Sequence, residues 1–240
     1  MPNHVKNILK MKGLTTLPLF TDKESWDKKM VPALDFSKII PMPESLDMVS
    51  GTIERVAVEA AVRKAAGAAK KTFGGPHLRP GLSDSEYETW RSRADMSEDE
   101  LVKLGAQYLQ NLILYGATTW YDWCVEHWGT KWNSYENTQI DPDTITFETA
   151  WSAPEPVIAQ LAKMYPDAEI EHWWADEDTG SNDGYARYSG GEAVEFVEYE
   201  QNSSEAFATY ILCWGESPCL YQDEHGTWCR RNCGECHGCD

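Results

Sequence analysis

The chain has 240 residues, of which 42% are hydrophobic and 12% aromatic, and this content excludes a globally disordered protein. It contains no run of about 18 apolar residues, so we expect no membrane contacts. It also lacks the apolar segment of a secretory signal near Met1, so we expect a cytoplasmic protein. The net charge of -18 is concentrated in residues 134–205, which hold 17 acidic and 2 basic residues, so direct nucleic-acid contact by that part is disfavoured.

The residue pattern of the N-terminal part, up to residue 43, predicts one strand and little further regular structure. Hydrophobic and polar residues alternate from Val5 to Met11, which is typical of a half-buried strand. A short helix is expected around 22–26. An extended segment is expected over 34–43, where two prolines stop it.

Residues 52–119 predict helices. The alanine-rich stretch 52–71 favours a helix, and its thin apolar stripe suggests a helix flanked by solvent. Ser97 and Glu100 form a capping-box pattern that opens a helix reaching Tyr115. Gly116 interrupts the pattern, and a further helix is expected from about 119 to 127.

The most informative stretch follows that helix. Gly129 is expected to stop it, and the turn Asp141–Pro142–Asp143 separates the following loop from a strand. On this strand Ile145, Phe147 and Trp151 are expected to share one buried face. Ser152 is expected to cap the next helix, with Pro154 and Pro156 in its first turn.

The remaining chain alternates between a helix and strands. We expect a helix at about 155–165, strands at 169–174, 185–188 and 192–200, a helix or strand at 205–214, and an irregular tail from Gly215. This order predicts an α+β fold with a ferredoxin-like antiparallel sheet and helices on one face. The expected domain spans 1–214 with a helical insertion at about 44–106, followed by a Cys-rich C-terminal tail at 215–240.

Several segments resemble the YubB-like family: Met1–Asn3, Phe36–Pro43, Trp120–Cys124, Trp128–Asn133 and Phe147–Val157. The similarity covers roughly 1–43 and 107–200 and is most specific between Trp120 and Trp151. The family comprises phage- and plasmid-borne proteins with a ferredoxin-like domain and no settled activity. The resemblance therefore implies an accessory protein of a mobile genetic element and carries over no catalytic residues.

The acidic segment leads to the preferred functional hypothesis, which is a non-enzymatic protein that binds and inhibits a host or defence protein. Carboxylates two residues apart on a strand lie on one face and repel one another, so a function can explain their retention. A surface of this kind can imitate nucleic acid toward a partner with a basic surface. The candidate partner-binding residues are Glu169, Glu171, Asp176, Glu177, Asp178, Glu195, Glu198 and Glu200.

The cysteines carry the strongest chemical signal. The spacing Cys229-x3-Cys233-x2-Cys236-x2-Cys239 resembles zinc knuckles, and Cys213 and Cys219 complete the candidate metal ligands, with zinc as the candidate cofactor. A flexible tail of reduced thiols is the competing interpretation, and the iron–sulfur signature is disfavoured because no barrel pattern accompanies it. A zinc-dependent regulatory or nucleic-acid-binding protein is thus the alternative function, with 52–71 as its basic contact.

An aromatic cluster at 120, 123, 128, 132 and 151 is interpreted mainly as core, and the alternative is that these tryptophans line a ligand pocket or stack bases. Lys131, the nearby cation, could clamp a carboxylate or pair with an acidic neighbour. Asp122 and His127 could form an acid–base pair, and Cys124 lies one helical turn before His127. A buried cysteine beside aromatic rings is the commoner arrangement. An enzyme of unknown class is therefore the least favoured hypothesis.

Overall fold

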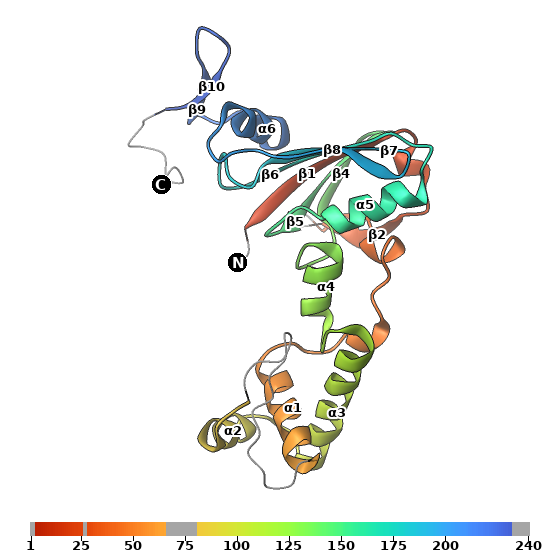
Figure 1. Cartoon of the computed structure of the whole chain (residues 1–240), viewed down its shortest axis with the longest axis vertical. Coiled ribbons are helices and arrows are strands. Elements are labelled where there is room, and N and C mark those ends of the chain that lie inside the picture. The colour runs from red at the N-terminus through yellow and green to blue at the C-terminus, as the bar shows by residue number, and fades with distance from the viewer. Residues whose placement is uncertain (1–2, 26–27, 66–80, 232–240) are drawn as a thin grey trace. The chain divides into compact units, whose positions relative to one another are not determined.

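The computed structural model describes residues 3–25, 28–65 and 81–231, drawn in colour in Figure 1. Their contacts divide the chain into two units, one formed by Met1–Pro41 with His127–Asp240 and the other by Met42–Glu126. The end of the expected 52–71 helix, the Gly/Pro-rich residues 74–80 and three tail cysteines lie outside the described residues. Within the described ranges, no helix is long and apolar enough to cross a membrane.

The first unit is built on a six-stranded antiparallel sheet with the order β4-β5-β1-β6-β7-β8. The strands are β1 (His4–Met11), β4 (Tyr135–Asp141), β5 (Thr144–Ala150), β6 (Ile170–Asp176), β7 (Gly184–Ser189) and β8 (Glu192–Glu198). The chain runs β1, then α4 (Trp120–Trp128), β4, β5, α5 (Glu155–Met164) and β6. This succession and the strand order β6-β1-β5-β4 are those of a ferredoxin-like fold, as predicted, with β7 and β8 added beside β6.

Helices lie on both faces of this sheet. Val5 and Leu9 of β1 and Phe147 of β5 are fully buried on the face that α5 covers. On the opposite face lies α6 (Ser204–Trp214), whose Trp214 donates through Nε1 to the Ala175 carbonyl at 2.9 Å. Figure 1 shows α5 and α6 on opposite sides of the strands. The α5 layer on one face was predicted. On the other face, α6 adds a second, partial helical layer that was not.

Three buried polar side chains cross the covered face. Asn7 of β1 donates to the Thr149 hydroxyl at 2.9 Å, and its amide oxygen meets His172 Nε2 at 2.9 Å. Burial lowers the pKa of His172 to about 3, so the imidazole is neutral near pH 7. Because buried polar groups are costly without partners, these bonds favour one register of β5, β1 and β6.

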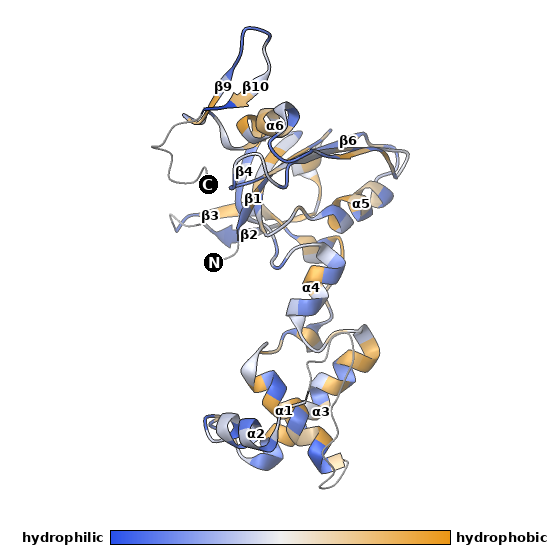
Figure 2. Ribbon diagram, turned by 60° about the vertical axis from the view of Figure 1, so that its left-hand side comes forward, coloured by the Kyte–Doolittle hydropathy of each residue, from blue (hydrophilic) through white to orange (hydrophobic). Residues whose placement is uncertain are grey.

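A two-stranded hairpin replaces the helix expected around 22–26. It consists of β2 (Phe20–Glu24) and β3 (Met30–Leu34), followed by a 3-10 turn over Phe36–Lys38. In Figure 2, β3 is mostly hydrophobic and β2 hydrophilic, and the buried end of β3 explains why the segment is extended. The Leu34 amide donates to the Asn137 side chain at 3.0 Å, which ties the hairpin to β4.

The prediction for the stretch around β5 is correct in outline and wrong in two details. Gly129 ends α4 with φ +75°, and an added Cβ would lie 2.7 Å from Pro156 Cδ, so the close approach also requires glycine. Ser152 does not cap α5, because its hydroxyl donates to the Gly129 carbonyl instead. The segment before the Pro142 turn, expected as a loop, forms the edge strand β4.

Trp151 is not a core residue. β5 ends at Ala150, and Trp151 follows in the left-handed region with φ +76° and 41% of its surface exposed. The period-two pattern therefore breaks one residue before the tryptophan. Its backbone N–H donates to the Asn3 carbonyl at 2.9 Å, which turns the chain out of the sheet.

The second unit is helical and contains α1 (Thr52–Ala65), α2 (Asp84–Arg91), α3 (Glu98–Tyr115) and most of α4. Both α2 and α3 begin with complete capping boxes, and the one at Ser97 was predicted. The solvent-flanked interpretation of α1 is wrong, because its residues 56–62 are all buried. Small alanine side chains let α3 approach α1 closely, and even Glu59 is buried against Arg63 at 2.8 Å.

The tail after Gly215 is more regular than expected. A small hairpin forms from β9 (Leu220–Gln222) and β10 (Trp228–Arg230). The Trp228 amide donates to the Ser204 hydroxyl at 2.9 Å, and the Arg230 guanidinium lies 5.5 Å from the Phe207 ring. These contacts hold the hairpin on α6.

Gly105 tests the packing of α1 on α3. A Cβ at this position would lie 1.9 Å from the Ala57 carbonyl oxygen and 2.8 Å from Ala61 Cβ. We expect Gly105→Ala to lower the unfolding free energy of the helical unit by roughly 1–3 kcal/mol, as overpacking does, although alanine is the better helix former. Denaturant unfolding followed by helical circular dichroism checks this. Gln110→Ala, on the exposed side of α3, is the control, and an unchanged midpoint for Gly105→Ala would refute the close packing.

Trp151 tests the boundary of the β5 core. We expect Trp151→Ala to cost about 1 kcal/mol or less, against about 3–5 kcal/mol for Phe147→Ala in the buried layer. Trp151→Gly should be at least as stable as Trp151→Ala, since glycine tolerates the positive φ. Equilibrium unfolding of the three variants decides the matter. A Trp151→Ala loss as large as that of Phe147→Ala would restore the core interpretation.

Candidate functional site

Three of the predicted partner-binding carboxylates are paired with cations on the face of the sheet opposite α5. Glu169 and Glu195 each lie 3.7 Å from the Arg187 guanidinium. Glu171 lies 3.6 Å from Lys10 Nζ and accepts a hydrogen bond from the Tyr185 hydroxyl at 3.2 Å. Cations on the neighbouring strands, Lys10 and Arg187, thereby offset the repulsion expected between Glu169 and Glu171.

Three more of these residues organise the end of β6. Asp176 is buried and accepts hydrogen bonds from Asn3, Asn182 and the Asp178 amide. Glu177 accepts from the His4 amide at 3.1 Å, and Asp178 accepts from the Asn3 side chain at 2.8 Å. These carboxylates hold the start of β1 against β6.

The remaining two, Glu198 and Glu200, lie at the far edge of the sheet and are exposed. Glu192, at the start of β8, joins them although the sequence analysis did not single it out. Within the part of the chain that the structure describes, these three carboxylates have no hydrogen-bond or ion-pair partner. We call Glu192, Glu198 and Glu200 the free acidic edge. A hairpin register could have identified Glu192, since Gly190–Gly191 places it opposite Ser189.

The candidate metal ligands are only partly described. Cys213 is buried in α6, and burial raises the pKa of its thiol to about 12, with the negative charge of Asp183 adding to the effect. Cys219 is disulfide-bonded, contrary to the expectation of reduced cysteines, and Cys229 is a free thiol in β10. Cys233, Cys236 and Cys239 lie outside the described residues. Across 3–25, 28–65 and 81–231 no three His, Cys, Asp or Glu residues are grouped to hold a metal ion.

Cys124 has the surroundings of a structural cysteine. It is buried, its sulfur lies 3.9 Å from that of Met42, and burial raises the pKa of the thiol to about 12. A nucleophilic cysteine needs the opposite shift. Trp123 and Trp128 are buried as predicted, and Trp128 donates to the Ile40 carbonyl at 3.0 Å.

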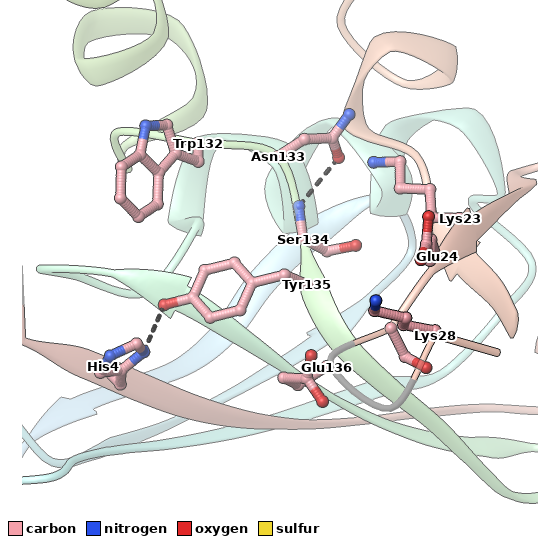
Figure 3. Close-up of a pocket in the computed structure, with 10 residues that line it drawn as sticks. His4, Lys23, Glu24, Lys28, Trp132, Asn133, Ser134, Tyr135 and Glu136 are labelled. Atoms are coloured by element: carbon pink, nitrogen blue, oxygen red, sulfur yellow. Dashed lines mark hydrogen bonds between the residues drawn. The ribbon is translucent and has the colours of Figure 1, made fainter. Parts of the chain in front are cut away.

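Trp132, by contrast, is 38% exposed and lies at a pocket, so for this residue the core interpretation is wrong. The pocket has a volume of about 610 Å³ and lies between the β2–β3 hairpin and the start of β4. Its lining residues are His4, Lys23, Glu24, Ser25, Lys28, Trp132, Asn133, Ser134, Tyr135 and Glu136. Figure 3 shows Trp132, Tyr135 and His4 on one side and Lys23, Glu24 and Lys28 on the other.

A hydrogen-bonded group fixes the aromatic side of the pocket. The Tyr135 hydroxyl lies 2.8 Å from His4 Nδ1 and donates to the Thr149 carbonyl at 3.0 Å. Glu148 Oε2 lies 3.5 Å from the same His4 nitrogen. Burial raises the pKa values of Tyr135 and Glu148, and the nearby charge of Glu136 raises both further. The Tyr135 ring is therefore neutral and held in one orientation.

The opposite side carries two lysines. Burial lowers the pKa of Lys23, and the attraction of Asp35 opposes that shift. Asp35 itself accepts hydrogen bonds from Thr21, Ser37 and Asn133. Lys28 is exposed and has φ +60°, and Glu136 has φ +45°, so two non-glycine residues of this pocket have left-handed backbones.

Lys131 lies beside the pocket between two indole rings. Its Nζ is 4.7 Å from the centre of the Trp132 ring and 4.9 Å from that of Trp151. Contacts of this kind are attractive because the ring faces carry partial negative charge. Lys131 was a candidate carboxylate clamp from the sequence, and the structure gives it aromatic neighbours on two sides.

Asp183 is the most perturbed carboxylate of the described residues. It is 1% exposed, and neither oxygen has a partner at full hydrogen-bond geometry. Its pKa is raised to about 8, first by burial and then by the negative charge of Asp176, while the Asp176 backbone N–H acts in the opposite direction. Asp183 is therefore largely protonated at neutral pH.

This protonation predicts a pH-dependent stability. The folded state holds the Asp183 proton more tightly than the unfolded state does. The resulting stabilisation is fully present below the unfolded pKa of 3.8 and is lost as the pH rises through about 8. Asp183→Asn removes that loss. We expect the difference in unfolding free energy between Asp183→Asn and wild type to grow from near zero at pH 4 to at least about 1 kcal/mol at pH 8. Urea unfolding at both pH values measures it, and a constant difference would contradict the buried-proton interpretation.

A comparison with known protein families agrees with the observed topology. Residues 127–211 match the family model of the ferredoxin-like domain in Api92-like protein. The chain is similar to the crystal structure of protein api92 from Yersinia pseudotuberculosis at 14% identity, covering 83% of this chain and 99% of that chain, with a TM-score of 0.36. No protein of curated function matches the chain. The family match and the strand order together identify the part from the end of α4 into α6 as a ferredoxin-like domain.

Proposed function

We propose that this protein acts by non-covalent binding, and that its free acidic edge contacts a basic surface on another protein. The observation that carries the proposal is the contrast among its carboxylates. Glu169, Glu171 and Glu195 are paired with cations, whereas Glu192, Glu198 and Glu200 keep unpaired charges at one edge. No lysine or arginine occurs from 188 to 229, so nothing in that sequence neutralises this edge.

The position of the edge favours side-chain contact with a partner. Among the residues that the structure describes, β8 pairs only with β7, and a register shift opposite Arg187 and Tyr188 disturbs its regularity. Irregularity and charge both discourage edge strands from pairing with another sheet. Val194 and Phe196, 51% and 43% exposed, supply apolar area between the carboxylates. Such a surface suits a partner with lysines or arginines around an apolar centre.

The resemblance to phage- and plasmid-borne proteins suggests the biological setting. In this proposal the chain is an accessory protein of a mobile element, acts in the host cytoplasm, and occupies a nucleic-acid-binding surface of a host or defence protein. The acidic edge takes the place of phosphates toward the partner. Its long-range attraction would speed association at low ionic strength.

The test compares two triple variants with the same change in net charge. Glu192→Gln/Glu198→Gln/Glu200→Gln removes the free acidic edge, and Glu169→Gln/Glu171→Gln/Glu195→Gln removes paired carboxylates. With a partner captured from a bacterial host lysate and then purified, association rates are measured between 50 and 300 mM salt. We expect the edge variant to bind roughly tenfold more slowly at low salt and to show a weaker salt dependence.

The paired-carboxylate variant should keep most of the wild-type rate and salt dependence. Equal effects of the two variants would mean that only total charge matters and would refute a defined edge site. Unchanged association in both would place the binding surface elsewhere. Thermal unfolding of each variant verifies that the fold is retained.

A further inference from the structure

We propose that the pocket beside β4 binds a small aromatic anion, meaning a planar ring joined to a phosphate or carboxylate group. This inference is independent of the proposed function, because β4 and β8 are opposite edges of the sheet. The pocket volume of about 610 Å³ lies in the range of small-molecule sites. The residues that line it come from three separate segments and supply three kinds of contact.

The first contact is a ring surface. Trp132 lies edge-to-face against Tyr135, with ring centres 6.3 Å apart, and is exposed at the pocket. Tyr135 is immobilised by His4 and the Thr149 carbonyl, and Lys131 contacts the Trp132 ring. Both rings are thus held in place before a ligand arrives, and a planar ligand ring can pack on them at small entropic cost.

The second contact is positive charge. Lys23 and Lys28 lie across the pocket from Trp132 in Figure 3. Lys23 is partly removed from water, which makes its charge costly. A bound anion would therefore stabilise the Lys23 ammonium more than it would stabilise a lysine fully exposed to water. A ring on one wall and lysines on the other suit a ligand that carries its negative group away from its ring.

The third contact is a limited set of hydrogen-bonding groups. The Asn133 oxygen already accepts from the Phe36 and Ser134 amides, and the Ser134 hydroxyl donates to the Leu34 carbonyl. His4 Nε2 has no partner among the described residues and is available as a donor or acceptor. Glu24 and Glu136 can accept hydrogen bonds from ring N–H groups.

Glu24 and Glu136 also limit the number of negative charges that the ligand can carry. They place negative charge in the same pocket as the lysines, and the chain as a whole carries -18. A nucleic-acid strand with many phosphates would be repelled, whereas a ligand with one anionic group can sit at the lysines. The inference is therefore restricted to small molecules.

Calorimetric titration of the full chain with four probes tests the proposal. Adenosine monophosphate and indole-3-acetate each join a ring to an anion, while adenosine and inorganic phosphate supply only one half. We expect at least one ring-bearing anion to bind with a Kd below about 1 mM, and each half alone to bind at least roughly tenfold more weakly. Preference between the first two probes distinguishes a phosphate from a carboxylate ligand. Absence of binding by both would overturn the proposal.

Matched variants locate the bound probe. Trp132→Ala and Lys28→Gln should each weaken binding at least roughly fivefold, in the range expected for losing a stacking surface or a charged contact. Tyr221→Ala and Lys29→Gln are the controls, because they remove an exposed aromatic side chain of β9 and a neighbouring lysine that do not line the pocket. These should change the Kd less than about twofold. Equal losses in variants and controls would show that binding occurs outside this pocket and would overturn the assignment.

Discussion

The fold of the first unit depends on the pairing of β1 with two strands that follow it by more than a hundred residues. Asn7 meets Thr149 across 142 positions of sequence and His172 across 165. All three side chains are almost fully buried, so each requires the others as hydrogen-bond partners. A shift of one residue would turn them to the opposite face and expose Val5 and Leu9. The buried hydrogen bonds therefore specify the register that brings the two halves of the unit together.

This central pairing distributes charge unevenly between the two edges of the sheet. The N-terminal segment brings Lys10 to Glu171 on the face opposite α5 and places Lys23 and Lys28 near β4. The acidic C-terminal strands lie on the other side, where Arg187 pairs with two carboxylates and the end of β8 has no cationic partner among the described residues. One edge thus combines lysines with aromatic rings, and the other combines free carboxylates with apolar residues. The two proposals follow from this separation.

Residues that the sequence marked as similar have different surroundings in the fold. Trp128 and Trp151 both belong to the most specific stretch, yet Trp128 is buried and Trp151 lies after the last residue of β5 with a positive φ. The difference arises because the Asn3 carbonyl accepts the Trp151 N–H, a contact from the other end of the chain. Hydrophobic periodicity cannot register such a contact. In α1, burial by α2 and α3 likewise exceeds what its thin apolar stripe suggested.

The sequence by itself determined the elements whose signals are local. Alternation identified β1 and β5, Ser97 and Glu100 identified the start of α3, and Gly129 identified the end of α4. These depend on backbone preference and on neighbours within a few residues. Only the tertiary structure decided that β2, β3 and β4 are strands, which carboxylates are paired, and that Trp132 and two lysines border one pocket. These features require segments far apart in the chain to meet, and their interaction energies arise only once β1 is paired.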